Sequence, residues 1–118
     1  MSEVEFLGLA ERTLAHIETL FDRLQEEEDV DIESRRQGNV LEVEVGEART
    51  KIIINIQTAM QEIWMATKLG GFHYRLVESC WINTRDGSEL MGTLFDFVGQ
   101  ECGRKFLINF EFTPSVGS

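Results

Sequence analysis

The segment NIQTAMQEIWMATKLGGFHY, residues 55–74, contains the clearest strand–turn–strand pattern of the chain. Just before it, Ile52, Ile54 and Ile56 alternate with other residues, and a period of two places all three on one face of a β-sheet. After the turn at residues 58–60, Ile63 and Met65 have the same inward phase. We therefore expect two antiparallel strands with these five side chains in the core.

Trp64 has the outward phase of this pattern, which is unusual for a tryptophan. Glu62 shares its strand face, and Asn55 and Gln57 have the outward phase of the neighbouring strand. His73 lies out of phase with the apolar residues on either side of it and joins the same face. An exposed Trp among polar side chains is typical of an interface anchor, so these residues predict a partner-binding surface. Two alternatives stay open, because a loop or helix capping the ring, or a one-residue register shift, would bury it.

Apolar residues at helical spacing predict an amphipathic helix over residues 3–27. They are Phe6, Ala10, Leu14, Ile17, Leu20, Phe21 and Leu24. A second helix is expected after Asp86, which has the pattern of an N-cap with Glu89 three residues later, and Gly103 ends it. His16 is expected to be a surface residue of the first helix, and Trp81 a core residue.

Short segments separated by turn residues predict antiparallel strands. We expect strands at residues 30–35, 40–45, 50–57, 63–67, 72–76, 80–83 and 106–112. This order of elements predicts an α+β fold, with two helices packed on one face of an antiparallel β-sheet, in a single domain over residues 1–118. The other face of the sheet is then left to water, with Trp64 on it.

Negative charge is concentrated at the start of the chain. The formal net charge is −10, and residues 1–33 hold eleven acids against Arg12 and Arg23, a net of −9. Such a field repels nucleic acid and anionic lipid, and it attracts cations and basic proteins. We therefore expect neither a nucleic-acid nor a membrane partner.

Carboxylates of the first helix form a stripe that continues into the first strand. They are Glu11, Glu18, Asp22, Glu26, Glu27, Asp29, Asp31 and Glu33. Like charges four residues apart on a helix repel by about 0.2–0.5 kcal/mol per pair, so the stripe lowers local stability. All-oxygen donors suit iron, Mn²⁺, Ca²⁺ or Mg²⁺ rather than Zn²⁺ or Cu⁺. The stripe predicts a weak and poorly selective metal-binding surface, with a merely solvated acidic face as the alternative.

Cys80 and Cys102 match no metal-binding spacing and are expected to be free, half-buried thiols, so no iron–sulfur cluster is expected on this chain alone. No segment approaches the roughly 18 apolar residues of a membrane span. The N-terminal residues MSEVEF are acidic, whereas a signal or transit peptide is basic. These features predict a cytoplasmic protein.

The chain resembles the frataxin family, and its bacterial members in particular. The likeness is carried by the acidic first helix, the IIINIQT strand, the segment IWMATKLGGFHY, and W-x-x-x-x-D-G-x-x-L from Trp81 to Leu90. The resemblance implies the frataxin fold and binding of iron, as Fe²⁺ or Fe³⁺, through the acidic ridge. It also implies a role in iron–sulfur cluster assembly through contact with the cysteine desulfurase and its scaffold protein.

The resemblance further implies roles for single residues. Asn55, Gln57 and Trp64 correspond to sheet-surface positions that the family uses for partner contact. His73 lies where a basic residue or His is usual. The ridge carboxylates of the family correspond to Glu18, Asp22, Asp29, Asp31 and Glu33. One position departs from the family pattern, because Ala59 stands where Pro is usual, and this change loosens the turn before Trp64.

A non-catalytic regulator is the function that we favour, combining weak iron binding on the ridge with docking onto a basic site of the desulfurase complex. No catalytic residue is predicted. A ferroxidase or iron store is one alternative, although the sequence lacks the Glu-x-x-His pairs of a preorganised di-iron site. An iron-independent acidic interaction module is the other. We expect a monomer, and leave open both oligomers driven by iron and the sign of the regulation.

Overall fold

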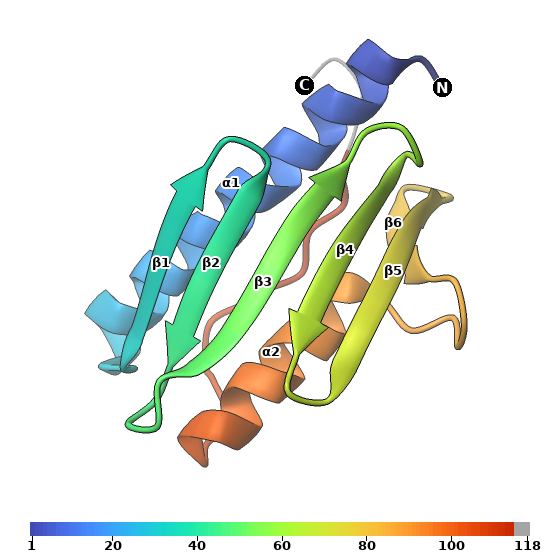
Figure 1. The fold of residues 1–118 in the computed structure, drawn as a ribbon. Coiled ribbons are helices and arrows are strands. Elements are labelled where there is room, and N and C mark those ends of the chain that lie inside the picture. Colours follow the sequence, from blue (N-terminus) through green and yellow to red (C-terminus); the bar gives the residue numbers. More distant parts are fainter. Residues whose placement is uncertain (115–118) are drawn as a thin grey trace.

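The computed structural model describes residues 1–114 and contains a six-stranded antiparallel sheet. The strands lie in sequence order across the sheet (Figure 1). They are β1 (Ile32–Gln37), β2 (Val40–Val45), β3 (Thr50–Gln57), β4 (Glu62–Thr67), β5 (Gly70–Val77) and β6 (Cys80–Asn83). The expected meander is therefore confirmed, with the boundaries of three strands shifted by one or two residues.

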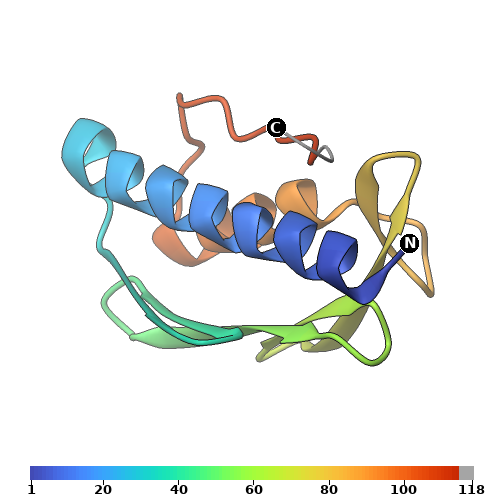
Figure 2. The ribbon, with the colours of Figure 1, turned by 90° about the horizontal axis from the view of Figure 1, so that it is seen from above.

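Two helices cover one face of this sheet. They are α1 (Glu3–Glu28) and α2 (Leu90–Cys102), and Figure 2 shows both on the same side of the strands. Within residues 1–114, no helix or strand covers the opposite face. The predicted α+β architecture is confirmed.

The core lies between the helices and the inward side chains of the strands. Ile52, Ile54 and Ile56 are at most 3% exposed, as their alternation predicts, and each contributes about 1.5–3 kcal/mol by leaving water. Trp81 is also buried, and its indole nitrogen donates a hydrogen bond of 2.8 Å to the Thr13 hydroxyl. The buried ring thus has its polar atom satisfied by α1.

Both ends of α1 follow from its sequence. Ser2 accepts from the Glu5 backbone N–H at 3.0 Å, while the Glu5 side chain accepts from the Ser2 N–H, which makes a capping box. At the other end, Asp29 takes a left-handed conformation and the Val30 N–H donates to the Leu24 carbonyl. Val30 therefore still belongs to the helix cap, which explains why β1 begins at Ile32 rather than at residue 30.

The expected start of α2 is wrong by three residues. Its N-cap is Glu89, whose carboxylate accepts from the Met91 and Gly92 N–H groups. A bridge between Ile82 and Glu89 keeps the backbone extended up to that point. The Asp86 carboxylate accepts instead from the Ser88 N–H at 2.9 Å, closing a turn before the helix.

The expected strand at residues 106–112 is also wrong. This segment has no strand structure and runs over the helices on the side away from the sheet (Figure 2). Its alternating apolar side chains pack on the helices, and Phe110 stacks on Phe95 with ring centroids 5.0 Å apart. An extended segment with one buried side has the same period of two as a strand, so alternation alone could not distinguish them. The tail expected after Pro114 lies outside the described residues.

A buried carboxylate at the end of α1 holds this segment. The Glu28 side chain is only 4% exposed and accepts from the Leu107 and Ile108 N–H groups at 2.9 and 3.0 Å. Arg104 donates to the Glu28 carbonyl at 2.7 Å and lies 3.4 Å from its carboxylate. Glu28 therefore takes the place of a neighbouring strand as the acceptor for these backbone donors.

Replacing Glu28 should release the segment. The variant Glu28→Ala leaves the Leu107 and Ile108 N–H groups without their acceptor, and we expect a loss of about 1–3 kcal/mol in unfolding free energy. Urea denaturation measures this loss. The matched control is Glu26→Ala, the same change at an exposed position of the same helix, and equal losses in the two variants would contradict the role given to Glu28.

Candidate functional site

The uncovered face of the sheet carries the predicted partner-binding residues in two neighbouring rows, one of which pairs Gln57 on β3 with Glu62 on β4. Asn55 on β3, Trp64 on β4 and His73 on β5 are consecutive partners in the strand register. Trp64 is half-buried, and it lies on the face opposite the two helices because its neighbours Ile63 and Met65 fill the core. The strand register places the ring as expected, so within residues 1–114 neither a register shift nor a covering helix buries it.

Trp64 and His73 form an ordered ring pair. Their ring centroids are 4.2 Å apart and their planes differ by 7°, which is a stacked arrangement between neighbouring strands. One face of the indole is therefore covered by the imidazole. The other face is not part of this stack, and Asn55 on β3 is the register partner of Trp64 on that side of the strand.

Glu62 differs from expectation, because it is buried although it points away from the core. Its side chain is 5% exposed, whereas those of His73 and Arg75 beside it are 48% and 58% exposed. Trp64 donates its indole N–H to one carboxylate oxygen at 2.8 Å, and Arg75 donates to the other at 2.8 Å. The His73 Nδ1 lies 3.7 Å from the first oxygen. The sequence predicts a solvated Glu62, and this prediction is wrong because the surrounding side chains exclude water from the carboxylate.

Arg75 is a member of this cluster that the sequence analysis missed. It lies directly opposite Glu62 in the β4–β5 register, on the same face as His73 two residues earlier. Extending the outward phase of His73 by one more step along the strand would have found it.

The pKa of Glu62 is lowered by the cluster. Burial by itself raises the pKa of this carboxyl, but the hydrogen bonds from Trp64 and Arg75, together with the charges of Arg75 and His73, outweigh it. Glu62 is therefore held as a carboxylate, and the cluster consists of a buried anion beneath two basic side chains.

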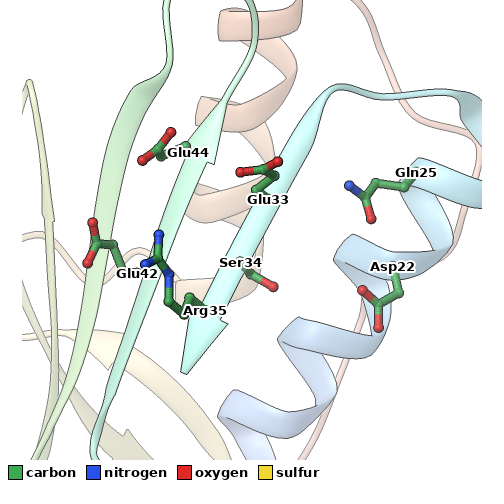
Figure 3. Close-up of a pocket in the computed structure, with 7 residues that line it drawn as sticks. All are labelled: Asp22, Gln25, Glu33, Ser34, Arg35, Glu42 and Glu44. Atoms are coloured by element: carbon green, nitrogen blue, oxygen red, sulfur yellow. The ribbon is translucent and has the colours of Figure 1, made fainter. Parts of the chain in front are cut away.

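The predicted metal ligands lie along α1, its exit and β1. Two of them, Asp22 and Glu33, line a groove of about 260 Å³ between the helix and the sheet edge. Glu42 and Glu44 on β2 line the same groove and were missed by the sequence analysis (Figure 3). The outward phase of β2 would have identified both. The Gln25 side chain donates to the Ile32 carbonyl and fixes the helix against β1 at this point.

Several of these carboxylates have a basic neighbour. Arg36 lies 3.6 Å from Glu18, and Arg23 lies 2.7 Å from Glu27. Arg49 is 3.9 Å from Asp31 and 3.7 Å from Glu33. Within the described part of the chain, no ion pair involves the remaining four, which are Glu11, Asp22, Glu26 and Asp29.

No preformed metal site is found among residues 1–114, because no three His, Cys, Asp or Glu side chains gather closely enough to hold an ion. The roles of the eight carboxylates in iron binding stay a prediction. Cys80 and Cys102 are free, half-buried thiols, as expected. Within the same residues, no helix has the length and apolar character to cross a membrane.

His16 is not the surface residue that we expected. It is half-buried and stacks on Phe112, with ring centroids 4.3 Å apart. Burial, and then the charge of Arg23, lower the pKa of His16, so the ring is held neutral against the C-terminal segment.

A family model and individual relatives that match this chain agree with one another. A family model described as a frataxin-like domain matches residues 1–104. The iron-sulfur cluster assembly protein CyaY of Janthinobacterium sp. (strain Marseille) is 48% identical over 103 residues, which cover 87% of this chain and 92% of that protein. The protein of the same name from Herminiimonas arsenicoxydans has the same identity and coverage.

Solved structures show the same fold. A frataxin from Psychromonas ingrahamii superposes with a TM-score of 0.80 and 28% identity, covering 95% of this chain and all of that one. A trimeric frataxin from the yeast Saccharomyces cerevisiae, complexed with ferrous iron, gives a TM-score of 0.70 at 22% identity. That match covers 81% of this chain and 87% of the yeast chain.

The contribution of Glu62 to stability should depend on pH. Because its folded-state pKa lies below the ordinary value of 4.5, the stabilisation is present above that pH and is lost as the pH falls through the folded-state pKa. We expect the difference in unfolding free energy between the wild type and Glu62→Gln to shrink as the pH falls below 4.5. Urea denaturation at several pH values measures it, and a difference that grows towards acid would be the opposite result.

Neutralising unpaired ridge acids should stabilise the chain. Asp22 and Glu26 are exposed helix neighbours four residues apart, so removing both charges in Asp22→Asn/Glu26→Gln relieves a repulsion of about 0.2–0.5 kcal/mol. We expect a higher melting temperature at low salt and a smaller gain at high salt. The control Glu18→Gln should show no gain because it loses its contact with Arg36. A double variant that melts at or below the wild type at low salt would contradict the repulsion.

Proposed function

This chain belongs to the frataxin family, and from that premise we propose that it is a non-catalytic accessory protein of iron–sulfur cluster assembly. In this proposal it binds iron weakly at its surface and docks onto the cysteine desulfurase and its scaffold protein, which adjusts the rate of sulfur transfer. The relatives named as iron-sulfur cluster assembly proteins support the pathway. The yeast frataxin complexed with ferrous iron supports the metal.

The acidic ridge supports iron as the ligand. Carboxylate oxygens are donors that suit Fe²⁺ and Fe³⁺, and the groove beside Asp22 places acids of α1, β1 and β2 near one another. No three donors converge among the described residues, so we propose weak binding at Glu11, Glu18, Asp22, Glu26, Glu27, Asp29, Asp31 and Glu33. The paired members, such as Glu18 with Arg36, must exchange a basic neighbour for the metal.

One observation carries the docking proposal, namely the ordered Trp64 cluster on the sheet face that the helices leave free. Aromatic residues held in a fixed orientation dominate the binding energy of many interfaces. Asn55 and Gln57 on β3 and His73 on β5 surround Trp64 and supply polar contacts. The negative field of the ridge attracts a basic partner surface and accelerates its approach.

The net negative charge of the chain also supports the proposal that neither nucleic acid nor a membrane is a partner. A formal net charge of −10 opposes binding to nucleic acid and to anionic membranes. We propose that residues 1–118 act as one domain in the cytoplasm, as a monomer in the absence of iron.

Reconstituted cluster assembly tests this function. Desulfurase turnover and cluster formation are measured across iron concentrations with wild type, Trp64→Ala and the ridge variant Asp22→Asn/Glu26→Gln. We expect the wild type to change both rates. Trp64→Ala should weaken docking by roughly tenfold or more, as expected for a central aromatic anchor. The ridge variant should weaken iron binding and slow association, most clearly at low salt.

The matched control for the ridge variant is Glu78→Gln/Glu111→Gln, which also removes two exposed carboxylates but lies outside the ridge. Rates that do not respond to the wild-type protein at any iron concentration would overturn the proposal. Iron oxidation at productive turnover would favour the ferroxidase or storage alternative. Docking that is indifferent to iron would favour the acidic interaction module.

A further inference from the structure

Glu62 is a buried carboxylate on a sheet face that no described helix covers. Glutamate is almost never fully buried unless it is paired, because removing its charge from water is costly. On the solvated face of a sheet, a long polar side chain could instead extend into water at no such cost. The burial of Glu62 therefore needs a reason in the side chains that surround it.

Two of those side chains donate hydrogen bonds to it, and a third places a ring nitrogen close to it. The Trp64 indole N–H and the Arg75 guanidinium each donate a hydrogen bond of 2.8 Å, one to each carboxylate oxygen. The His73 Nδ1 lies 3.7 Å from the oxygen that Trp64 uses. Trp64 and Glu62 are two residues apart on β4, while Arg75 is the cross-strand partner of Glu62 on β5. The carboxylate thus joins two strands through three side chains.

These contacts restrict the rotation of the Trp64 indole ring. Its N–H points along β4 to Glu62, and one of its faces is covered by His73 at a centroid distance of 4.2 Å. Rotation of the indole would break both contacts and leave the Glu62 carboxylate buried without one of its two hydrogen-bond donors, which is costly. A partner therefore meets the outer edge of the ring and the face that His73 does not cover.

We propose that Glu62 is a positioning residue, which holds the Trp64 indole in a partner-ready orientation by occupying its N–H and by anchoring Arg75 and His73 beside it. This inference rests on the proposed docking role of Trp64. It adds that the partner recognises the ring through apolar or stacking contact and not through the indole N–H. A ring fixed before binding loses less conformational entropy on docking, which increases affinity.

The free protein supplies the first test, through hydrogen exchange of the two indole N–H groups measured by NMR. In Glu62→Ala, we expect exchange of the Trp64 indole proton to accelerate by about tenfold or more, since a hydrogen bond to a charged acceptor is lost. Exchange at Trp81 should not change, because that indole is bonded to Thr13 within the core. Trp81 is thus an internal control for global destabilisation.

Binding to the cysteine desulfurase supplies the second test, with Glu62→Ala, Glu62→Gln, Trp64→Ala and the double variant Glu62→Ala/Trp64→Ala. We expect Glu62→Ala to weaken binding about tenfold, and Glu62→Gln to weaken it less because the amide oxygen can still accept from the indole. In the Trp64→Ala background, Glu62→Ala should have no further effect, since the two residues then act as one unit. Glu111→Gln, which removes an exposed carboxylate outside both the sheet and the ridge, should bind like the wild type.

The two proposals fail in different ways. If Trp64→Ala binds the desulfurase as well as the wild type, the docking role is wrong, whatever the exchange data show. If Trp64→Ala weakens binding but Glu62→Ala changes neither the exchange of the Trp64 indole nor the affinity, the positioning role is wrong. Equal acceleration at Trp64 and Trp81 would assign Glu62 to global stability alone and would also overturn the positioning role.

Discussion

Burial of one sheet face beneath α1 and α2 is the constraint on which the rest of this molecule depends. The apolar side chains in the inward rows of β2, β3 and β4 are withdrawn from water, with Ile52, Ile54 and Ile63 as examples. Because the side chains of a strand alternate, this burial fixes the direction of every outward residue as well. The position of Trp64 on the free face follows from the packing of its two neighbours, and does not require any property of the ring itself.

Two buried carboxylates perform similar structural tasks at opposite sides of the fold. Glu28 accepts from backbone donors of the C-terminal segment, and Glu62 accepts from the side chains of Trp64 and Arg75. In each case both carboxylate oxygens accept hydrogen bonds, which offset the cost of burying the charge. The first carboxylate attaches an irregular segment to a helix, while the second orders a surface.

The unpaired acidic side chains and the aromatic cluster lie on different parts of the surface of this protein. The unpaired acids lie on α1 and its exit, as Asp22 and Asp29 do, whereas the aromatic cluster lies on β4 and β5. Long-range attraction of a basic partner and short-range contact with an ordered ring are distinct contributions to recognition, and salt weakens mainly the first. In the frataxin-family role proposed here, iron bound at the ridge would change the first contribution and leave the second intact.

The sequence by itself determined the elements whose signals are local. Alternation in β3 and helical spacing in α1 are properties of neighbouring residues, so the sheet, both helices, the outward phase of Trp64 and the uneven distribution of charge could all be predicted. Only the tertiary structure decided that residues 106–112 pack on the helices rather than in the sheet, and that Glu62 is buried rather than solvated. Both outcomes depend on donors and surfaces far away in the chain or on a neighbouring strand, such as Glu28 for Ile108 and Arg75 for Glu62. A periodic pattern shows which way a side chain points, but its surroundings are set by the segments that fold against it.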